Sequence, residues 1–337
     1  MRAWQVRHHG EPRDALVAVE VTPPVPEAGE VRIRVSAAAL ALPDVLMCRG
    51  TYALTPAPPF TPGQEVAGVV SAVGPGVGVE IGSRVMAVTA FYRGHGGFAD
   101  EALAGAVNTY PAPPSMSDRD AAAFHIAFQT AWIGLMRRGR LQPGDHLLVL
   151  GAAGGTGAAA VQLGRALGAR VIAVAAGVEK VEYCRGLGAH VVIDRLVDGV
   201  PETVAEATGG HGVDLVYDPV GGSAGTEALR CVANGGGLLA VGFASGEWPD
   251  LAVRDLVTRN CSIMGVFAGA YTRDEHDEMH RELLALVDGG DVSVPVHRTV
   301  DFDDIPAALE ELAQARTLGR TVALVSAASH DERAARR

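Results

Sequence analysis

The pattern of apolar and polar residues changes character near residue 120. Before that point, short segments rich in β-forming apolar residues alternate with proline and glycine turns, as in 30–40, 65–79, 82–90 and 96–104. Short strands at close spacing are typical of a twisted β-barrel-like domain, without the regular helices of a parallel sheet. We therefore predict that residues 1–122 form a β-rich domain.

Helical and strand patterns alternate beyond that point. A long helix is predicted over 118–139. Six short buried strands follow, at 146–150, 170–175, 190–194, 214–220, 236–243 and 261–267. Strands that alternate with helices in this order predict a parallel sheet covered by helices on both faces. We assign this second domain to residues 123–269.

The remaining chain returns to shorter, mixed elements. We expect a helix at 278–290, an extended segment at 294–300, a helix at 305–315 and a strand at 320–325. Residues 270–330 are predicted to complete the first domain. The final residues, 331–337, are small or charged and are expected to form a frayed tail.

Composition narrows the class of protein. The chain has 337 residues, 48% of them hydrophobic, which fits about two packed domains. Its net charge of -11 repels phosphate backbones and anionic membrane surfaces, so neither nucleic acid nor a membrane is expected as the main partner. The N-terminus lacks the apolar run of a signal, and no segment reaches the ~18 apolar residues of a membrane-spanning helix. The four cysteines show no paired spacing, which favours a reducing, cytoplasmic location.

A glycine-rich loop joins the predicted strand Leu147–Leu150 to the next helix. The sequence "GAAGGTGAAA" points backbone amides and the positive end of a helix dipole at one place, where a diphosphate can bind. Glycines there let the phosphates approach the backbone, and Gly157 lets the helix lie close to the strand. The alternative is that the glycines serve only packing. The expected cofactor contacts are Ala153, Gly154, Gly155, Thr156 and Gly157.

The end of the second parallel strand decides which dinucleotide fits. NAD-specific sites place a carboxylate there for the adenosine ribose, whereas this chain has Val174-Ala175-Ala176-Gly177. A 2′-phosphate near Ala176 would meet no acid, and Lys180 and Arg195 could pair with it. We therefore predict NADPH. The alternatives are a solvated helix-start lysine for Lys180 and an ordinary loop arginine for Arg195.

Several motifs in order resemble the medium-chain dehydrogenase/reductase superfamily, in its zinc-independent quinone oxidoreductase, or zeta-crystallin-like, branch. They are "RGTYALTPAPPFTPGQEVAGVVSAVG", "AAGGTGAAAVQLGRALGA", "GVDLVYDPVGG", "GGLLAVGFASG" and "LGRTVALV". The resemblance runs from residue 1 to about residue 326. It implies an α/β fold with an N-terminal GroES-like β-barrel catalytic domain and a Rossmann doubly wound parallel-sheet domain.

Zinc-dependent members of that superfamily hold a catalytic metal with side chains that this chain lacks. Their cysteine, three residues before the aspartate that matches Asp44, is replaced by Ala41, and their histidine before the glutamate is replaced by Gln64. The third ligand region is the apolar "HIAFQT". Catalytic zinc needs three N, S or O ligands. His95 and His125 are better explained as packed histidines, so we predict no metal.

Without a metal, reduction of an activated acceptor is favoured over alcohol oxidation. Forming an alkoxide without a Lewis acid has a high energy barrier. A quinol or enolate oxygen, by contrast, needs only hydrogen-bond stabilisation. By resemblance, Tyr52 faces the nicotinamide cleft and assists at the acceptor oxygen, and Thr130 lies near the nicotinamide. The alternatives are a pocket wall for Tyr52 and helix packing for Thr130.

The resemblance also implies a substrate pocket at Ala41, Leu46 and Tyr52. Many quinone reductases of this type carry asparagine where this chain has Ala41, and Leu46 and Arg49 also depart from their motif. A more apolar α,β-unsaturated carbonyl is therefore as plausible an acceptor as a quinone. Further cofactor contacts implied by the resemblance are Gly221, Gly222, Gly242, Phe243, Ala244, Ser245, Val266, Phe267, Ala268 and Arg320; loop geometry alone, and a surface arginine, are the alternatives.

We predict a zinc-independent reductase that transfers hydride from NADPH to a quinone or enone lodged between the two domains. Two alternatives stay open: an enoyl-thioester reductase acting on acyl-CoA or acyl-carrier substrates, and a non-catalytic NADPH-binding protein. By analogy we also expect a homodimer, in which the apolar strand at 261–267 lies at a sheet edge and pairs with a second copy. An internal strand is the alternative.

Overall fold

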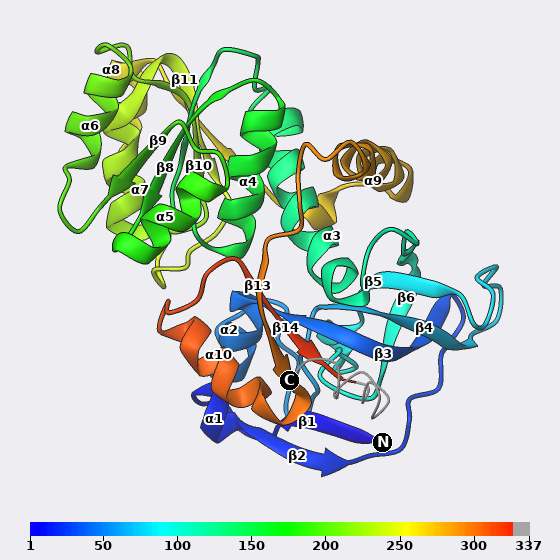
Figure 1. Ribbon diagram of the computed structural model, residues 1–337. Helices are drawn as coiled ribbons and strands as arrows, with labels where there is room; N and C mark the ends of the chain where they lie inside the picture. Colours follow the sequence, from blue (N-terminus) through cyan, green and yellow to red (C-terminus); the bar gives the residue numbers. More distant parts are fainter. Residues whose placement is uncertain (326–337) are drawn as a thin grey trace. The chain divides into compact units, whose positions relative to one another are not determined.

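A computed structural model describes residues 1–325, which form two compact units (Figure 1). One unit comprises Met1–Ile126 and the described chain from Val296 onward; the other is Ala127–Pro295. The second boundary thus falls at 295/296, where the sequence analysis placed it at 269/270. The predicted tail, 331–337, lies outside the described residues.

Helix α9 (Arg273–Asp288) explains that difference. It belongs to the second unit, where it buries Met279 and Leu283 and where Glu278 is bonded to Arg137. The side chains of Gln129 and His276 share a hydrogen bond of 2.7 Å. The sequence pattern predicted this helix. Its amphipathic pattern shows that one face is buried but does not show against which domain.

The first unit is built on a six-stranded sheet in the order β13-β14-β3-β4-β5-β6. The strands are β3 (Glu30–Leu40), β4 (Glu65–Val73), β5 (Arg84–Thr89), β6 (Glu101–Pro111), β13 (Val296–Asp301) and β14 (Arg320–Leu324). Strand β3 pairs with β4 along one edge and, along the other, with β6 in its first half and β14 in its second. This double pairing closes the sheet into a barrel. The C-terminal strand β14 therefore lies in the first unit, paired with β3.

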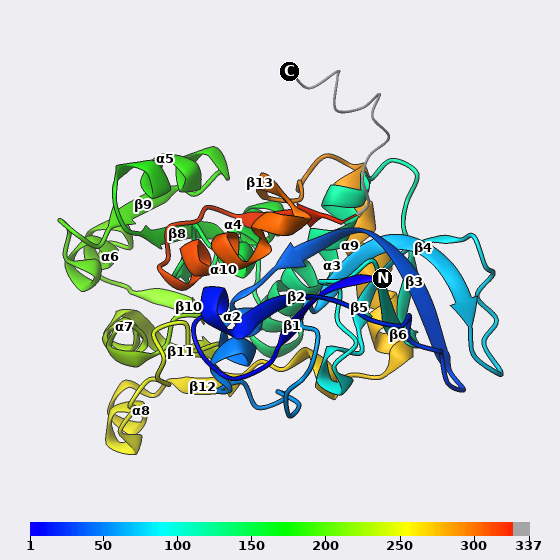
Figure 2. The ribbon, with the colours of Figure 1, turned by 90° about the horizontal axis from the view of Figure 1, so that it is seen from below.

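Side chains of β3 explain why this strand is central. Val31, Ile33 and Val35 are buried, as period-two alternation predicts for a sheet with one face in the core. Three helices pack together beside the barrel in Figures 1 and 2: α1 (Pro12–Ala15), α2 (Leu42–Arg49) and α10 (Ile305–Ala313). A two-stranded sheet of β1 (Arg2–Val6) and β2 (Leu16–Glu20) and two 3-10 turns, η1 (Phe91–Arg93) and η5 (Phe302–Asp304), complete the described unit.

The second unit contains a fully parallel six-stranded sheet in the order β12-β11-β10-β7-β8-β9 (Figure 2). Its strands are β7 (His146–Val149), β8 (Arg170–Ala175), β9 (Val191–Asp194), β10 (Val213–Asp218), β11 (Val232–Ala240) and β12 (Ser262–Gly265). Its helices include α4 (Gly155–Ala166), α5 (Val178–Gly186), α6 (Val200–Ala207), α7 (Gly222–Ala228) and α8 (Val253–Arg259), with 3-10 turns η3 (Leu229–Cys231) and η4 (Ala268–Ala270). Strand order reverses between β7 and β10, and ligands of such sheets bind at that switch point.

The helix predicted over 118–139 consists of two parts. It is α3 (Asp118–Trp132) followed by a π-helical turn, η2 (Ile133–Arg138). The Gly139 amide donates to the Gly134 carbonyl across five residues, at 2.7 Å. A Cβ on Gly139 would lie 2.4 Å from Leu215 Cδ2, so glycine lets this turn approach β10 closely. Within residues 1–325, no helix has the length and apolar character needed to span a membrane.

Candidate functional site

The glycine-rich loop runs from β7 into α4 as the sequence predicted. Gly151 has a φ of +56°, and Gly154 is the N-cap of α4 without a side-chain cap. The first amides of α4 therefore face outward with no capping side chain from Gly154, and the positive end of the helix dipole adds to them. Such an arrangement suits a diphosphate.

Gly157 cannot carry a side chain in this fold. A Cβ there would lie 2.3 Å from the Gly151 carbonyl oxygen and 2.9 Å from Ala152 Cα. Backbone atoms at that distance must move to accommodate it, so glycine sets how closely α4 packs on the loop. By contrast, a Cβ on Gly154 would lie 3.3 Å from the Gly151 oxygen, which is a tight but smaller conflict.

Thr156 is tied to the neighbouring strand. Its Oγ1 and the Tyr217 hydroxyl share a hydrogen bond of 2.5 Å, and Tyr217 is fully buried in β10. Burial raises the pKa of Tyr217, so this phenol stays protonated. The bond links the glycine loop to β10 across the switch point. Sequence reasoning missed Tyr217, whose only signal was a polar hydroxyl inside the apolar strand "DLVYDPV".

Two cations follow β8 and β9: Lys180 lies in the first turn of α5, and Arg195 comes directly after β9. Burial lowers the pKa of Lys180, and the positive charge of Arg195 lowers it further. An anion between two such groups relieves their repulsion, which is the behaviour expected of a 2′-phosphate subsite. That Lys180 and Arg195 bind a 2′-phosphate stays a prediction.

One carboxylate at this end was not foreseen. Asp194, the last residue of β9, accepts hydrogen bonds from the amides of Gly177 (2.9 Å) and Leu196 (3.1 Å). These bonds lower the pKa of Asp194, so it stays ionised, and they occupy it with backbone donors. Gly177 has a φ of +87°, which brings its amide toward this carboxylate.

Two turns beyond β10 and β11 are bonded to each other. The Ser245 amide donates to the Val220 carbonyl at 2.9 Å, and the Gly222 amide donates to the Glu247 carbonyl at 2.8 Å. A Cβ on Gly221 would lie 2.3 Å from the Glu247 oxygen. The predicted cofactor turns 221–222 and 242–245 therefore form one surface.

Asp218, at the end of β10, holds the first of these turns. Its carboxylate accepts hydrogen bonds from the amides of Val220 and Gly221, and burial raises the pKa of Asp218.

The other expected contacts of the second unit are dispersed. Thr130 lies on α3 and is partly exposed. Val266 follows β12 and is buried, with its amide donating to the Ala240 carbonyl at 3.0 Å. Phe267 is 64% exposed, and Ala268 begins η4. Their contact with cofactor stays a prediction.

In the first unit, Tyr52 lies half-buried after α2. Its ring packs on Phe91 with centroids 6.4 Å apart. Burial raises the pKa of the Tyr52 hydroxyl, and the charge of Asp44 also raises it. A protonated phenol can donate a hydrogen bond or a proton. Of the other expected pocket residues, Ala41 is the N-cap of α2 and Leu46 lies within that helix.

Asp44 holds this part of the first unit together. Its fully buried carboxylate accepts from the amides of Ala41 (2.9 Å) and Gly63 (3.0 Å). It thereby joins the start of α2 to the loop before β4. Burial raises the pKa of Asp44 to about 7, against these hydrogen bonds. The sequence motif marked this position only as a landmark for the absent zinc ligands, and the structural role of Asp44 was not foreseen.

Arg320 has a partner that the sequence did not reveal. Its Nη2 lies 2.7 Å from Glu65 Oε2, and both side chains are buried. Glu65 also accepts from the Ile126 amide at 2.9 Å. Burial raises the pKa of Glu65 to about 7, while the charge of Arg320 lowers it. The expected contact of Arg320 with cofactor phosphates stays a prediction.

The residues at the zinc-ligand positions do not fit zinc. Ala41 offers no donor atom, and Gln64 supplies an amide in place of an imidazole. His125 is buried and its ring lies 4.3 Å from that of Tyr110. Residues 1–325 contain no group of three or more His, Cys, Asp or Glu placed to hold a metal ion.

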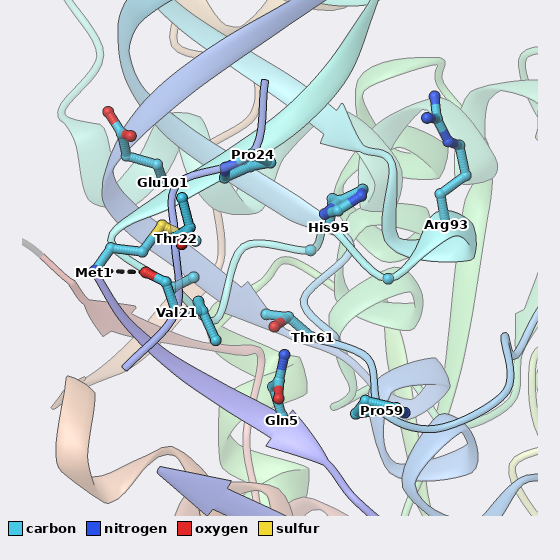
Figure 3. A pocket seen from close by; sticks show the side chains of 13 residues that line it. Met1, Gln5, Val21, Thr22, Pro24, Pro59, Thr61, Arg93, His95 and Glu101 are labelled. Carbon is cyan, nitrogen blue, oxygen red and sulfur yellow. Dashed lines mark hydrogen bonds between the residues drawn. The ribbon is translucent and has the colours of Figure 1, made fainter. Parts of the chain in front are cut away.

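A hollow of about 200 Å³ in the first unit lies apart from all these residues (Figure 3). Met1, Gln5, Thr61, Arg93 and His95 contribute to its wall, and the Met1 amine donates to the Val21 carbonyl at 2.8 Å. Arg93 is already paired with Glu27 and Glu30. None of the predicted site residues lines this hollow.

Comparison with known proteins places this geometry in a family. The profile described as alcohol dehydrogenase GroES-like domain matches residues 27–114, and that described as zinc-binding dehydrogenase matches residues 155–287. Quinone oxidoreductase-like protein 2 of Bos taurus is 32% identical over 312 residues, 91% of this chain and 88% of that protein. The chain therefore belongs to the medium-chain dehydrogenase/reductase superfamily, in its quinone oxidoreductase-like branch.

Solved structures agree with this family and confirm the predicted fold class. Escherichia coli quinone oxidoreductase, in complex with NADPH, is 28% identical, with a TM-score of 0.88 over 96% of this chain and 100% of that one. A 2-haloacrylate reductase is 32% identical, with a TM-score of 0.83 over 97% of this chain and 100% of that one. One of the two matching profiles is described as a zinc-binding dehydrogenase. This chain nevertheless carries Ala41 and Gln64 at the positions of the zinc ligands.

Proposed function

We propose that this protein reduces a quinone or an α,β-unsaturated carbonyl without a metal, with Tyr52 assisting at the acceptor oxygen. The coarser class is not in question: the chain is an NADPH-dependent medium-chain reductase. When bound, NADPH supplies the hydride. The further claims concern the acceptor, the absence of zinc and the roles of individual residues.

The observation that carries the proposal is the pair Ala41 and Gln64 at the ligand positions, together with the half-buried Tyr52, whose ring packs on Phe91. Without a Lewis acid, an alcohol substrate would have to lose its proton unaided, which is a large barrier. A quinol or enolate oxygen spreads its charge, so one phenol donor stabilises it adequately. The donor set therefore favours reduction of activated acceptors.

Cofactor binding falls to the second unit. We assign the diphosphate to the first amides of α4 and the 2′-phosphate to Lys180 and Arg195. The turns at 221–222 and 242–245 would line the same carboxyl edge of the sheet, where such folds bind dinucleotides. Asp194 would not oppose the phosphate strongly, because its oxygens accept from the Gly177 and Leu196 amides.

The test is steady-state NADPH oxidation with 1,4-benzoquinone, 9,10-phenanthrenequinone and crotonyl-CoA. We expect turnover with at least one quinone in metal-free buffer, unchanged by prior treatment with a chelator. Tyr52→Phe should lower kcat about 10²-fold or more and leave NADPH affinity unchanged. Stoichiometric zinc by elemental analysis, with activity lost on its removal, would contradict the metal-free mechanism.

A second acceptor class has its own support. The similar 2-haloacrylate reductase is named for an activated carbon–carbon double bond, and Ala41 gives the expected pocket an apolar wall. Faster turnover of crotonyl-CoA than of either quinone would favour the enoyl-thioester alternative. NADPH binding without oxidation by any acceptor would favour the non-catalytic alternative.

We also propose a homodimer formed through β12. This strand lies at the end of the parallel sheet, so the alternative of an internal strand is wrong for the described residues. Ile263 on β12 is 42% exposed, and α8 beside it has no buried residue. An open apolar strand edge is a natural pairing surface for a second copy. Light scattering at micromolar concentration should report about twice the chain mass; a monomer would refute this.

A further inference from the structure

The order of the parallel strands indicates where the nicotinamide end of NADPH is expected. The proposed 2′-phosphate residues Lys180 and Arg195 follow β8 and β9, and the diphosphate loop follows β7. Since a dinucleotide lies across the switch point between β7 and β10, its other half extends past β10 towards β11 and β12. The segment that follows β12, residues 266–271, is therefore expected to flank the nicotinamide.

The first end of segment 266–271 is held by the sheet. The Val266 amide donates to the Ala240 carbonyl at 3.0 Å, which continues the pairing of β12 with β11. Beyond Val266 the segment is mostly exposed: Phe267 is 64% exposed, and Ala268–Ala270 form the short turn η4. A short exposed segment takes its position from its two ends, so its attachment beyond η4 also decides where it lies.

A buried side chain of α3 provides that second attachment. Gln129 is 2% exposed and bonds His276 in the first turn of α9, which lies beside α3 in Figures 1 and 2. The Gln129 Nε2 donates to the His276 carbonyl at 3.3 Å, and Gln129 Oε1 lies 2.7 Å from His276 Nδ1. The His276 ring in turn contacts the Tyr271 ring, with centroids 6.2 Å apart. Gln129 is thus joined through His276 to the last residue of the segment.

These two bonds also decide which nitrogen of His276 carries a hydrogen. A carbonyl oxygen only accepts, so the NH2 group of Gln129 must face it, which leaves the amide oxygen facing Nδ1. That oxygen also only accepts, so Nδ1 must be the donor. Burial lowers the pKa of His276, so at neutral pH the ring is uncharged and carries its one N–H at Nδ1. The amide and His276 therefore fit each other in one orientation.

We propose that Gln129 is a positioning residue for the nicotinamide half of the cofactor: by holding His276 against α3, it fixes segment 266–271 in place. The next residue of α3, Thr130, is the one predicted to lie near the nicotinamide. One buried amide thereby keeps the two predicted neighbours of that ring, Thr130 and residues 266–268, at a constant distance from each other. This inference rests on the proposed function, in that it takes residues 266–268 as cofactor contacts.

The first test compares NADPH with 2′-phospho-ADP-ribose, a fragment of it that lacks the nicotinamide. Gln129→Met keeps the length of the side chain and removes both bonds to His276. It should raise the Kd for NADPH about tenfold and leave the Kd for the fragment within about twofold, because the adenosine and diphosphate sites keep their shape. Isothermal titration calorimetry measures both values. Equal weakening of the two ligands, or no change in either, overturns the inference.

Gln162→Met is the matched control. It removes another buried amide of the second unit, which bonds the backbone of Ser293 through both of its polar atoms. This substitution should leave the ratio of the two Kd values as in the wild type. If Gln162→Met changed that ratio as much as Gln129→Met does, any lost buried amide would have the same effect, and Gln129 would have no special role.

Two substitutions of His276 keep the test decisive should Gln129→Met fail to fold. His276→Leu removes the Nδ1 donor and should repeat the selective loss of NADPH affinity. His276→Asn can place an amide nitrogen where Nδ1 lies, so it retains a donor for Gln129 and should bind NADPH like the wild type. Equal NADPH affinities of these two variants would show that the hydrogen bond does not position the segment.

The second test needs no ligand. Nitrogen NMR of isotope-labelled histidine side chains, with the His276 signals identified by their absence in His276→Asn, reports which ring nitrogen carries the hydrogen. We expect the Nδ1–H form in the wild type at neutral pH. The Nε2–H form would contradict the bond from Nδ1 to Gln129 and would remove the basis of the proposal.

The two proposals fail differently. No turnover with any acceptor removes the proposed reaction, whereas the role of Gln129 is still decided by the two Kd values. Turnover by the wild type, together with equal losses of NADPH and fragment binding in Gln129→Met, leaves the proposed reaction standing and removes only the role of Gln129.

Discussion

Glu65 on β4 and Arg320 on β14 form a buried ion pair of 2.7 Å although 255 positions separate them in the chain. The pair connects two strands that flank β3 on opposite edges. Both charged side chains are removed from water. Each buried charge is therefore stable only while its partner stays within hydrogen-bond distance.

The first prediction concerns that pair. Arg320→Met should lower the free energy of unfolding by about 3–5 kcal/mol, because it leaves the Glu65 carboxylate buried and unpaired. Adding Glu65→Gln should restore part of the loss. Urea unfolding followed by circular dichroism measures both. Arg298→Met is the matched control, since its pair with Glu311 is largely exposed and should change stability by no more than about 1 kcal/mol. Equal effects of the two arginine substitutions would contradict the argument.

The second prediction concerns the glycine loop. Gly157→Ala should destabilise the second unit and abolish tight NADPH binding, because its Cβ would lie 2.3 Å from the Gly151 oxygen. Gly186→Ala is the control: nothing lies within 4 Å of a Cβ there, and it belongs to helix α5. That change should be neutral or stabilising by up to about 1 kcal/mol. Fluorescence titration with NADPH checks both, and full-affinity binding by Gly157→Ala would refute the packing argument.

The third prediction concerns the choice of dinucleotide. Lys180→Ala and Arg195→Ala should each weaken NADPH binding about tenfold or more and leave NADH binding nearly unchanged, because each removes one charged partner of the 2′-phosphate. Arg185→Ala provides the comparison, since Arg185 is exposed on α5 and pairs with Glu182. The measurement is kcat/KM for both cofactors. A wild-type preference for NADH would contradict the assignment of Lys180 and Arg195 to the 2′-phosphate.

The fourth prediction concerns pH. Burial raises the pKa of Asp44 from 3.8 to about 7 in the folded chain. Between these values the folded state holds a proton that the unfolded state has released, so the contribution of Asp44 to stability falls as pH rises from about 4 to about 7. The slope of this contribution is about 1.4 kcal/mol per pH unit at most.

Asp44→Asn tests that sign, because the variant has no titrating group at this position. The difference in unfolding free energy between wild type and Asp44→Asn should become less favourable to wild type as pH rises over that range. Urea unfolding at several pH values between 4 and 8 measures it. A difference that grows in favour of wild type would show that the amide donors of Ala41 and Gly63 outweigh burial.

Local pattern was sufficient for much of this protein. The alternation along 30–40 reflects one buried face of a strand, and the glycines from 151 to 157 are needed where a strand turns sharply into a helix. Both are decided by neighbours a few residues apart, so the sequence alone predicted β3, the glycine loop of α4 and the alternation of strands and helices along the second unit. The family and the fold class followed from the same motifs and are confirmed.

Only the tertiary structure decided which distant side chains meet. The bond of Thr156 to Tyr217, the pair of Glu65 and Arg320, and the bond of the Gly63 amide to Asp44 join segments that a local sequence pattern does not connect. It also decided that α9 packs with the second unit, because an amphipathic face is compatible with more than one core. Buried polar groups depend most on these distant contacts, because burying a polar group costs free energy unless another part of the chain supplies a hydrogen-bond partner.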